Sequence, residues 1–488
     1  MNIVLLLVLV VWSIRIFANV LSYVHLWFVK EYRFDRMLIH LGTPQGRQIF
    51  FPSFRLPRIS PKTIVIFTGS GVIFVFLFLF LPIHVLLRFL VIDVVTFPIT
   101  GILVGLLQAP TFLYHRFLIV RAIRLLRDHK PMAVIGITGS FGKTSTKEYL
   151  ATILSGTYRV LKTEASKNSP IGIAETVLKH LTPDVQVFIV EMGAYKRGEI
   201  RAMADMVRPQ IGIITAVNAQ HQDLFATLEN TMRAKYELIQ GLQGKKIAII
   251  NADNPFTRHM GEWARRDGLP VWWYTARDGT ELEGVLLEAR EIEADEKGVT
   301  ARIVYGKRAY RLSANVLGEH QVGNISAAIA GAVAVGMDIR DAVKGASRVK
   351  PYPKTMEPAK GVHEATFIND TFNNNPDAAL AAIDFLAKTK GRKILVFQPM
   401  VELGAHAVES HKDVGRKASQ ICDDILLTNE NYYESIVAGA TEVGKEKKVR
   451  VLSARESASY IDKTVKKGDT VLFKGKEAER VFRLCFSQ

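Results

Sequence analysis

A glycine-rich segment ending in lysine and threonine is the first part of the sequence whose residues could do chemistry. It reads Gly136-Ile-Thr-Gly-Ser-Phe-Gly-Lys-Thr144, and it lies between an apolar β-branched run and a helix-like segment, residues 145–154. In this setting backbone N–H groups can approach phosphate oxygens, Lys143 can reach terminal phosphates, and the Thr144 hydroxyl can bind Mg²⁺. The pattern predicts a nucleotide phosphate loop, although Ile137 stands where the common motif has its first glycine.

Three further polar residues are candidates for the same site. Glu191 ends an apolar β-branched run and is expected at the carboxyl edge of a parallel sheet, where a carboxylate can hold a metal ion. His221 follows another such run after a short loop, and Lys235 lies in a predicted helix, residues 227–242. Taken singly, Glu191 is also compatible with a helix cap, His221 with a bystander in a polar loop, and Lys235 with a solvent-exposed helix face.

The elements that must position these residues follow an α/β rhythm from residue 131 onward. Short β-branched runs alternate with helical or loop segments, which predicts a parallel sheet covered by helices. Residues 282–313 alternate and carry acidic side chains, so they are expected to form a small antiparallel insertion or edge. A proline pair after Lys350 marks a boundary before a second α/β rhythm. The expected strands are 134–138, 185–190, 211–217, 246–251 and 271–274, then 365–368, 394–397, 425–428, 449–452 and 470–473.

Composition separates the first 130 residues from the other 358. The chain of 488 residues carries a net charge of +16, and residues 1–130 hold 14 Lys or Arg against 4 Asp or Glu. This distribution argues against a general nucleic-acid surface and favours a basic flank beside a membrane. The two cysteines, Cys422 and Cys485, are far apart and indicate neither a disulfide framework nor a zinc site.

Two apolar stretches, residues 2–28 and 63–112, are long enough to cross a hydrocarbon layer of roughly 30 Å. The second has room for two spans joined by a turn near Arg88 and Asp93. Basic residues flank both stretches, and the positive-inside rule then places everything after residue 115 in the cytoplasm. A cleaved signal peptide, or buried helices of a soluble domain, are the alternatives. We expect about three transmembrane helices near 2–28, 63–86 and 89–113, an α/β central ATP-binding domain at 131–350 and a smaller doubly wound domain at 351–488.

Together these motifs resemble those of the Mur ligases of peptidoglycan synthesis, and most of all the branch that adds D-alanyl-D-alanine. The resemblance covers residues 133 to about 480. The phosphate loop, the Glu-Met-Gly segment beginning at Glu191 and the segment around Lys235 carry it. Further matching segments are Thr163–Gly172, Thr215–Phe225, Leu317–Ala328, Ile368–Asp377 and Met400–Gly404.

The resemblance implies an ATP-dependent amide ligase that forms an acyl phosphate, which an amine then attacks. It implies that two α/β domains close over ATP and exclude water. The catalytic residues would be Lys143, Lys235 (carbamylated in relatives) and His221. ATP contacts would come from Gly139, Ser140, Gly142, Lys143, Thr144, Ser145, Asn324 and Asp370. The Mg²⁺ ligands would be Thr144, Glu191, His221 and Lys235, and the substrate contacts would be Asn168, Asn373 and Asn375.

Some positions depart from the family pattern, namely Ala216, Gln321, Thr355, Gln398 and Pro399. A membrane segment also stands where the family has a soluble domain that grips the UDP end of the precursor. The acceptor is therefore left open between a soluble or lipid-linked cell-wall precursor and another polymer, as in pseudomurein or polyglutamate ligases. A membrane-bound ATP-binding scaffold or regulator is the alternative to an enzyme. The expected partners are a precursor, an amino acid or dipeptide, and membrane lipid, with no nucleic acid, at the inner cell membrane with cytoplasmic catalytic domains.

Overall fold

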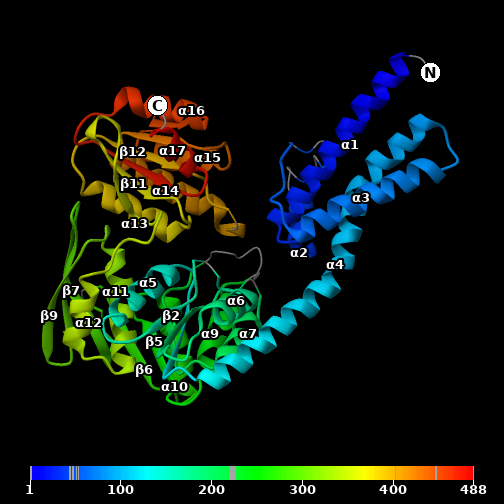
Figure 1. The fold of residues 1–488 in the computed structure, drawn as a ribbon. Helices are drawn as coiled ribbons and strands as arrows, with labels where there is room; N and C mark the ends of the chain where they lie inside the picture. Colours follow the sequence, from blue (N-terminus) through cyan, green and yellow to red (C-terminus); the bar gives the residue numbers. More distant parts are fainter. Residues whose placement is uncertain are drawn as a thin grey trace. The chain divides into compact units, whose positions relative to one another are not determined.

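The computed structural model describes most of the chain and divides it into two compact units, Met1–Phe117 and Leu118–Gln488. His221, a predicted site residue, lies outside the described residues. Figure 1 shows the course of the chain through both units. The described residues are 3–42, 46, 49–50, 52, 54–165, 167–194, 196–218, 227–277, 279–280, 282–401, 403–445 and 448–486.

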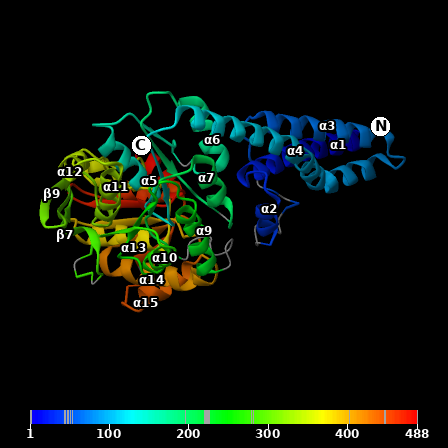
Figure 2. The same cartoon turned by 90° about the horizontal axis from the view of Figure 1, so that it is seen from below.

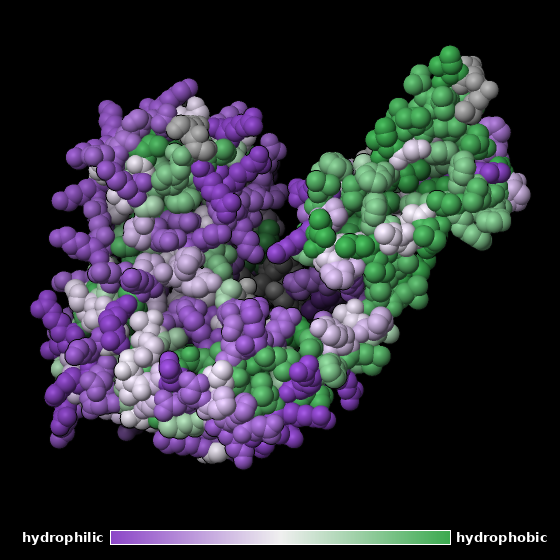
Figure 3. All heavy atoms as spheres, viewed as in Figure 1, coloured by the Kyte–Doolittle hydropathy of each residue, from purple (hydrophilic) through white to green (hydrophobic). Residues whose placement is uncertain are grey.

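The first unit is helical. In Figures 1 and 2, α1, α3 and the first part of α4 run side by side, and a small core that includes Val24, Trp27 and Ile66 holds them together. Among the described residues, these three helices are long and apolar enough to cross a membrane. Figure 3 shows apolar side chains over the surface of this unit. Its helices are α1 (Ile3–Val29), α2 (Phe34–Leu41), α3 (Pro61–Phe80) and α4 (Val85–His129).

The turn between α3 and α4 lies at residues 81–84, close to Arg88, whereas Asp93 lies within α4. The Arg88 guanidinium instead closes this turn by donating to the carbonyls of Phe78 and Ile83. Asp93 lies inside α4, where its carboxylate accepts hydrogen bonds from Arg15 Nε at 2.9 Å, Asn19 Nδ2 at 3.1 Å and Trp12 Nε1 at 3.2 Å. A carboxylate among apolar helices requires such partners. The charge that suggested a turn is therefore a packing contact between α1 and α4.

The larger sheet of the second unit has nine strands in the order β2-β3-β1-β4-β5-β6-β7-β8-β9. The strands from β2 to β7 pair in parallel, and β8 and β9 continue as an antiparallel edge. The predicted α/β class and antiparallel segment are thereby confirmed. The bounds are β1 (Ala133–Thr138), β2 (Val160–Lys162), β3 (Val187–Glu191), β4 (Ile211–Ile214), β5 (Ile247–Asn251), β6 (Val271–Thr275), β7 (Val285–Asp295), β8 (Gly298–Tyr305) and β9 (Arg308–Ala314).

Helices cover both faces of this sheet, as its continuously apolar strands require. Ile135 and Ile137 of β1 pack with α5, α11 and α12, while Val134 faces α6, α7, α9, α10 and the last turns of α4. The glycine-rich loop joins β1 directly to α5. The bounds are α5 (Lys143–Leu154), α6 (Pro170–His180), α7 (Glu199–Val207), α9 (Leu228–Gln240), α10 (Pro255–Arg266), α11 (His320–Val335) and α12 (Ile339–Ala346).

The second sheet has six strands in the order β10-β11-β15-β12-β13-β14, with β10 as an antiparallel edge. One face packs on α13, α14 and α15, the other on α16 and α17. The short edge strands β2 and β10 were not predicted, because neither contains a long β-branched run. The elements are β10 (Glu357–Lys360), η2 (Val362–Glu364), β11 (Thr366–Asp370), α13 (Pro376–Ala387), β12 (Lys393–Phe397), η3 (Gly404–His406), α14 (Ala407–Ile421), β13 (Asp424–Leu427), α15 (Tyr433–Thr441), β14 (Val449–Val451), α16 (Ala454–Thr464), β15 (Thr470–Lys474) and α17 (Ala478–Leu484).

Candidate functional site

The loop between β1 and α5 has the geometry of an anion cradle. Gly139 and Gly142 have φ angles of +157° and +79°, and a Cβ on Gly142 would lie 2.4 Å from Asn324 Oδ1. A Cβ on Gly139 would lie 2.0 Å from Thr215 Oγ1, so both positions require glycine. No side chain caps α5 at Gly142, which leaves N–H groups of its first turn for a ligand. Ser145 is buried in that first turn. The loop therefore fits the phosphates of a nucleotide.

Two predicted lysines lie at this loop. Lys143 Nζ donates to the carbonyl oxygens of Gly139 at 2.7 Å and Ser140 at 3.2 Å, and Lys235 Nζ donates to the Gly139 carbonyl at 3.2 Å. Burial lowers the pKa of the Lys143 ammonium. Burial and the nearby Lys143 charge together lower the pKa of Lys235 to about 7. Lys235 is consequently neutral in a large fraction of molecules near neutral pH, and a neutral amine is a nucleophile.

Glu191 is the centre of a polar cluster at the end of β3. Its carboxylate accepts hydrogen bonds from Thr144 Oγ1 at 3.0 Å and from Asn168 Nδ2 at 3.1 Å. The Lys147 ammonium lies 3.3 Å from the same Glu191 oxygen that Thr144 contacts. The structure thus brings together three of the predicted residues, Thr144, Asn168 and Glu191.

Sequence reasoning missed Lys147. Its side chain is fully buried, and its ammonium also donates to the Ala165 carbonyl at 2.7 Å. It follows Lys143 by four residues, one turn of helix, and that spacing was the signal available in the sequence. Lys147 neutralises the buried Glu191 carboxylate and fixes it against the segment that carries Asn168.

The oxygen atoms of Thr144 and Glu191 are the donor type that Mg²⁺ prefers. The described residues contain no group of three or more His, Cys, Asp or Glu side chains able to hold a metal ion. Thr144 and Glu191 therefore fit part of a magnesium site, to which His221, outside the described residues, cannot be assigned. Lys235 donates to the phosphate loop through an amine that carries hydrogen-bonding protons. It could bind a metal ion only after conversion to an anionic group such as a carbamate.

Asn324 of α11 lies against the phosphate loop. Its Oδ1 is 3.5 Å from Thr146 Oγ1, and its Nδ2 donates to Gln321 Oε1 at 3.0 Å. Gln321 Oε1 also accepts from the Tyr149 hydroxyl at 3.0 Å. Gln321, one of the departures from the family pattern, therefore orients Asn324 and links α11 to α5.

The three predicted residues of the second sheet domain lie in different environments. Asp370 accepts from Lys474 Nζ at 2.6 Å and from the Met356 backbone N–H at 3.2 Å, within the domain. Asn375 is buried and caps α13 by accepting from the Ala378 N–H at 3.0 Å. Asn373 is exposed. In this arrangement Asp370 and Asn375 are engaged in the fold, and the Asn373 side chain faces solvent.

A hydrogen-bonded link that sequence reasoning also missed joins the phosphate loop to α13. The Asn218 backbone N–H donates to Ser140 Oγ at 3.1 Å, and its side chain Nδ2 donates to Asp377 Oδ2 at 2.6 Å. The same Nδ2 lies 3.4 Å from Asn375 Oδ1. Ser140, predicted to contact ATP, is therefore connected through one residue to the domain that follows.

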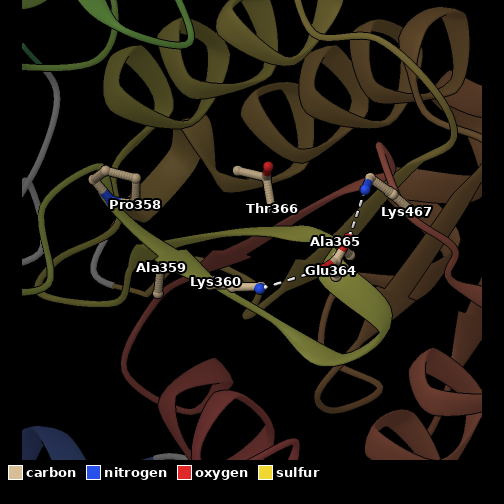
Figure 4. Close-up of a pocket in the computed structure, with 7 residues that line it drawn as sticks. All are labelled: Pro358, Ala359, Lys360, Glu364, Ala365, Thr366 and Lys467. Carbon is tan, nitrogen blue, oxygen red and sulfur yellow. Dashed lines mark hydrogen bonds and ion pairs between the residues drawn. The ribbon is translucent and has the colours of Figure 1, made fainter.

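A shallow surface hollow of about 470 Å³ lies at a different place, beside β10 and η2 (Figure 4). Lys360 and Lys467 approach the Glu364 carboxylate there, at 3.5 and 2.8 Å, and both lysines lower the pKa of that carboxyl group. None of the predicted site residues lines this hollow. It has no part in the nucleotide site.

Comparisons with known proteins identify the family. The family models "Mur ligase middle domain" and "Mur ligase, glutamate ligase domain" match residues 137–332 and 356–477. The chain belongs to the Mur ligase family, as its motifs predicted.

Within this family the chain is similar to enzymes named UDP-N-acetylmuramoyl-tripeptide--D-alanyl-D-alanine ligase. It is 31% identical to the one from Synechocystis sp. over 353 residues, which cover 71% of this chain and 72% of the relative. It is 29% identical to the Bacillus subtilis enzyme over 344 residues, which cover 70% and 72%. The crystal structure of MurF from Acinetobacter baumannii matches with a TM-score of 0.69 at 26% identity, covering 77% of this chain and 81% of that one. A pseudomurein peptide ligase from Methanothermus fervidus shares the fold, with a TM-score of 0.56 at 19% identity.

Proposed function

We propose that this chain is a membrane-anchored, ATP-dependent amide ligase that joins an amine such as D-alanyl-D-alanine to a carboxylate of a cell-wall precursor. The observation that carries the proposal is the convergence of Lys143, Lys235, Thr144 and Glu191 on one phosphate loop. The similarity to relatives named UDP-N-acetylmuramoyl-tripeptide--D-alanyl-D-alanine ligase supports the amine class. The proposed domains are an apolar membrane region up to residue 130, a central domain from 131 to 350 and a C-terminal domain from 351.

Bound ATP supplies the phosphoryl group that converts the carboxylate into an acyl phosphate, and phosphoryl transfer depends chiefly on charge neutralisation and positioning. Lys143 and the first-turn N–H groups of α5 hold the phosphates. Thr144 and Glu191 would hold Mg²⁺, which would supply further positive charge when bound. The neutral amine of Lys235 would add to CO₂ and release a proton, which replaces a neutral group by a carbamate anion beside Lys143.

The C-terminal domain presents the second substrate in this proposal. Asn373 is the exposed candidate for a substrate contact, and Asn168, hydrogen-bonded to Glu191, is the candidate in the central domain. The Asn218 link connects the phosphate loop to α13 of the C-terminal domain by hydrogen bonds. Closure of the two domains around the acyl phosphate excludes water and favours attack by the amine.

The first unit carries most of its described basic residues at one end, Arg15 and Arg88 being exceptions, and this distribution supports a membrane anchor with the ligase in the cytoplasm. Gln108 Nε2 of α4 donates to the Tyr32 carbonyl at 2.6 Å, and the Lys62 ammonium lies 4.4 Å from the centre of the Tyr32 ring. The end of α1, the start of α3 and the later part of α4 therefore meet there. The basic residues of this end include Lys30, Arg33, Arg36, Arg55, Arg58 and Lys62. The positive-inside rule assigns such an end to the side where ATP is present.

Phosphate release by the purified full chain tests the proposal. We expect release that requires ATP, Mg²⁺, a muramoyl tripeptide acceptor and D-alanyl-D-alanine together, and a loss of at least about 100-fold in Lys143→Ala, since phosphate-clamping charges supply several kcal/mol. Lys179→Ala, at an exposed position of α6, is the matched control. A chain that binds ATP but shows no substrate-dependent release would be a scaffold or regulator.

A further inference from the structure

We infer that the carboxylate acceptor is itself held in the membrane by a hydrocarbon chain, as a lipid-linked anionic precursor. This inference rests on the proposed ligase function and names the substrate class of the same site. It begins from the first unit, whose surface is apolar over most of its length. Large apolar side chains are more than half exposed on each long helix, for example Val11 on α1, Val72 on α3 and Leu106 on α4. Such a surface is typical of helices in contact with lipid chains.

The covalent connection between this unit and the ligase fold is short. The exposed apolar side chains of α4 reach Tyr114 and Phe117, and strand β1 begins at Ala133. As a helix, the path from Tyr114 to Ala133 is about 28 Å long, at 1.5 Å per residue. Ala122 and Leu126 on this path are buried in the core of the central domain. The chain that joins the two units is therefore a short continuation of α4.

The same part of α4 carries a basic face. Arg121, Arg124 and Arg127 follow one another at i, i+3 spacing on one exposed side of α4, with Asp128 beside them, and the exposed Lys130 comes directly after the helix. Ala122 and Leu126 point to the other face of the helix, into the core. Exposed guanidinium groups bind phosphate oxygens through paired hydrogen bonds. Next to a bilayer surface, this face fits the phosphate or diphosphate group that joins a lipid chain to its cargo.

Confinement to a membrane helps an enzyme only with a substrate confined to the same surface. A tether raises the effective concentration of two groups that share one surface, and it leaves encounters with a freely dissolved partner unchanged. A soluble nucleotide-linked acceptor would gain nothing from the anchored unit. A lipid-linked acceptor would gain both the shared surface and the basic face of α4.

The test compares two acceptors with the full chain embedded in phospholipid vesicles. Both carry the same muramoyl tripeptide, one linked to UDP and dissolved, the other linked through a diphosphate to a polyprenyl chain in the same vesicles. We expect kcat/KM for the lipid-linked acceptor to be at least tenfold higher. Equal or faster ligation of the UDP-linked acceptor would overturn the inference and leave the proposed ligase function intact. If neither acceptor supported phosphate release, the ligase function itself would be refuted.

A charge-reversal variant separates the role of the basic face from that of the anchor. We expect Arg124→Glu together with Arg127→Glu to raise KM for the lipid-linked acceptor at least fivefold, with KM for ATP and kcat unchanged. Arg340→Glu, on the exposed surface of α12, is the matched control and leaves all three values unchanged. An unchanged KM for the lipid-linked acceptor in the double variant would show that the basic face does not bind this acceptor.

Discussion

The titration of Lys235 leads to the sharpest prediction. Burial and the Lys143 charge lower its pKa to about 7. At a pH of about 7.4 such a lysine is roughly 70% neutral, whereas an ordinary lysine is roughly 0.1% neutral. Only the neutral amine can bond to CO₂, with loss of a proton, to give a carbamate. The positive charge of Lys143 that disfavours the ammonium also stabilises the carbamate anion. We therefore expect Lys235 to be carbamylated in the active protein.

The measurement is a ¹³C spectrum of the protein in labelled bicarbonate, together with phosphate release in buffers with and without CO₂. We expect a lysine carbamate signal that weakens as the pH falls through about 7, and a parallel loss of activity. Lys235→Met should abolish the signal and reduce activity at least about 100-fold, consistent with loss of an electrostatic catalytic group. Lys245→Met, at an exposed position, should leave both unchanged.

The same pKa predicts how stability depends on pH when no carbamate is present. In the folded state Lys235 loses its proton near pH 7, and in the unfolded state near 10.5. The unfolded state therefore binds more protons between these values, so the free energy of unfolding rises with pH across that window. Lys235→Met should lack this contribution. If the carbamate signal is absent and removal of CO₂ changes nothing, the reasoning about Lys235 is wrong.

Two further substitutions test the packing of charged groups. Lys147→Met leaves the Glu191 carboxylate without its buried cation and should lower the free energy of unfolding by about 3–5 kcal/mol in denaturant titrations. The Lys162 side chain is 39% exposed, so Lys162→Met is the control and should lower the free energy of unfolding by about 1 kcal/mol or less. Equal losses in these two variants would contradict the assignment of Lys147. Asp93→Asn removes the carboxylate charge that pairs with Arg15 between α1 and α4, so we expect a lower thermal midpoint in detergent. An unchanged midpoint would show that the pair does not hold the two helices together.

The sequence predicted those parts of the site that depend on local order along the chain. The phosphate loop, its flanking β1 and α5, and Glu191 at the end of β3 were recognisable because a strand, a turn and a helix follow one another directly. The spacing of Lys147 from Lys143 gave only its helix side, and its partner Glu191 could not be predicted because the pairing of β1 with β3 brings it close.

The same limit applies to the C-terminal domain and to the first unit. Asp370 was predicted to meet the nucleotide, but its partner Lys474 lies on β15, more than a hundred residues away in sequence. Asp93 suggested a turn because a charge in an apolar stretch commonly marks its end, and its pairing with Arg15 depends on helices meeting in space. Family motifs therefore located the residues, and long-range contacts determined what holds each of them.

The Asn218 link is one of the contacts between the two ligase domains, and the Lys388–Glu319 ion pair is another. Asn218 reaches Ser140 through its backbone and Asp377 through its side chain. A hydrogen bond of this kind contributes about 0.5–3 kcal/mol, with the higher values for charged partners. Breaking it therefore requires no more free energy than the binding of a small substrate supplies. A ligand that accepts from or donates to Ser140 Oγ would compete with the Asn218 N–H for that oxygen, so we expect bound nucleotide to weaken the link between the phosphate loop and α13.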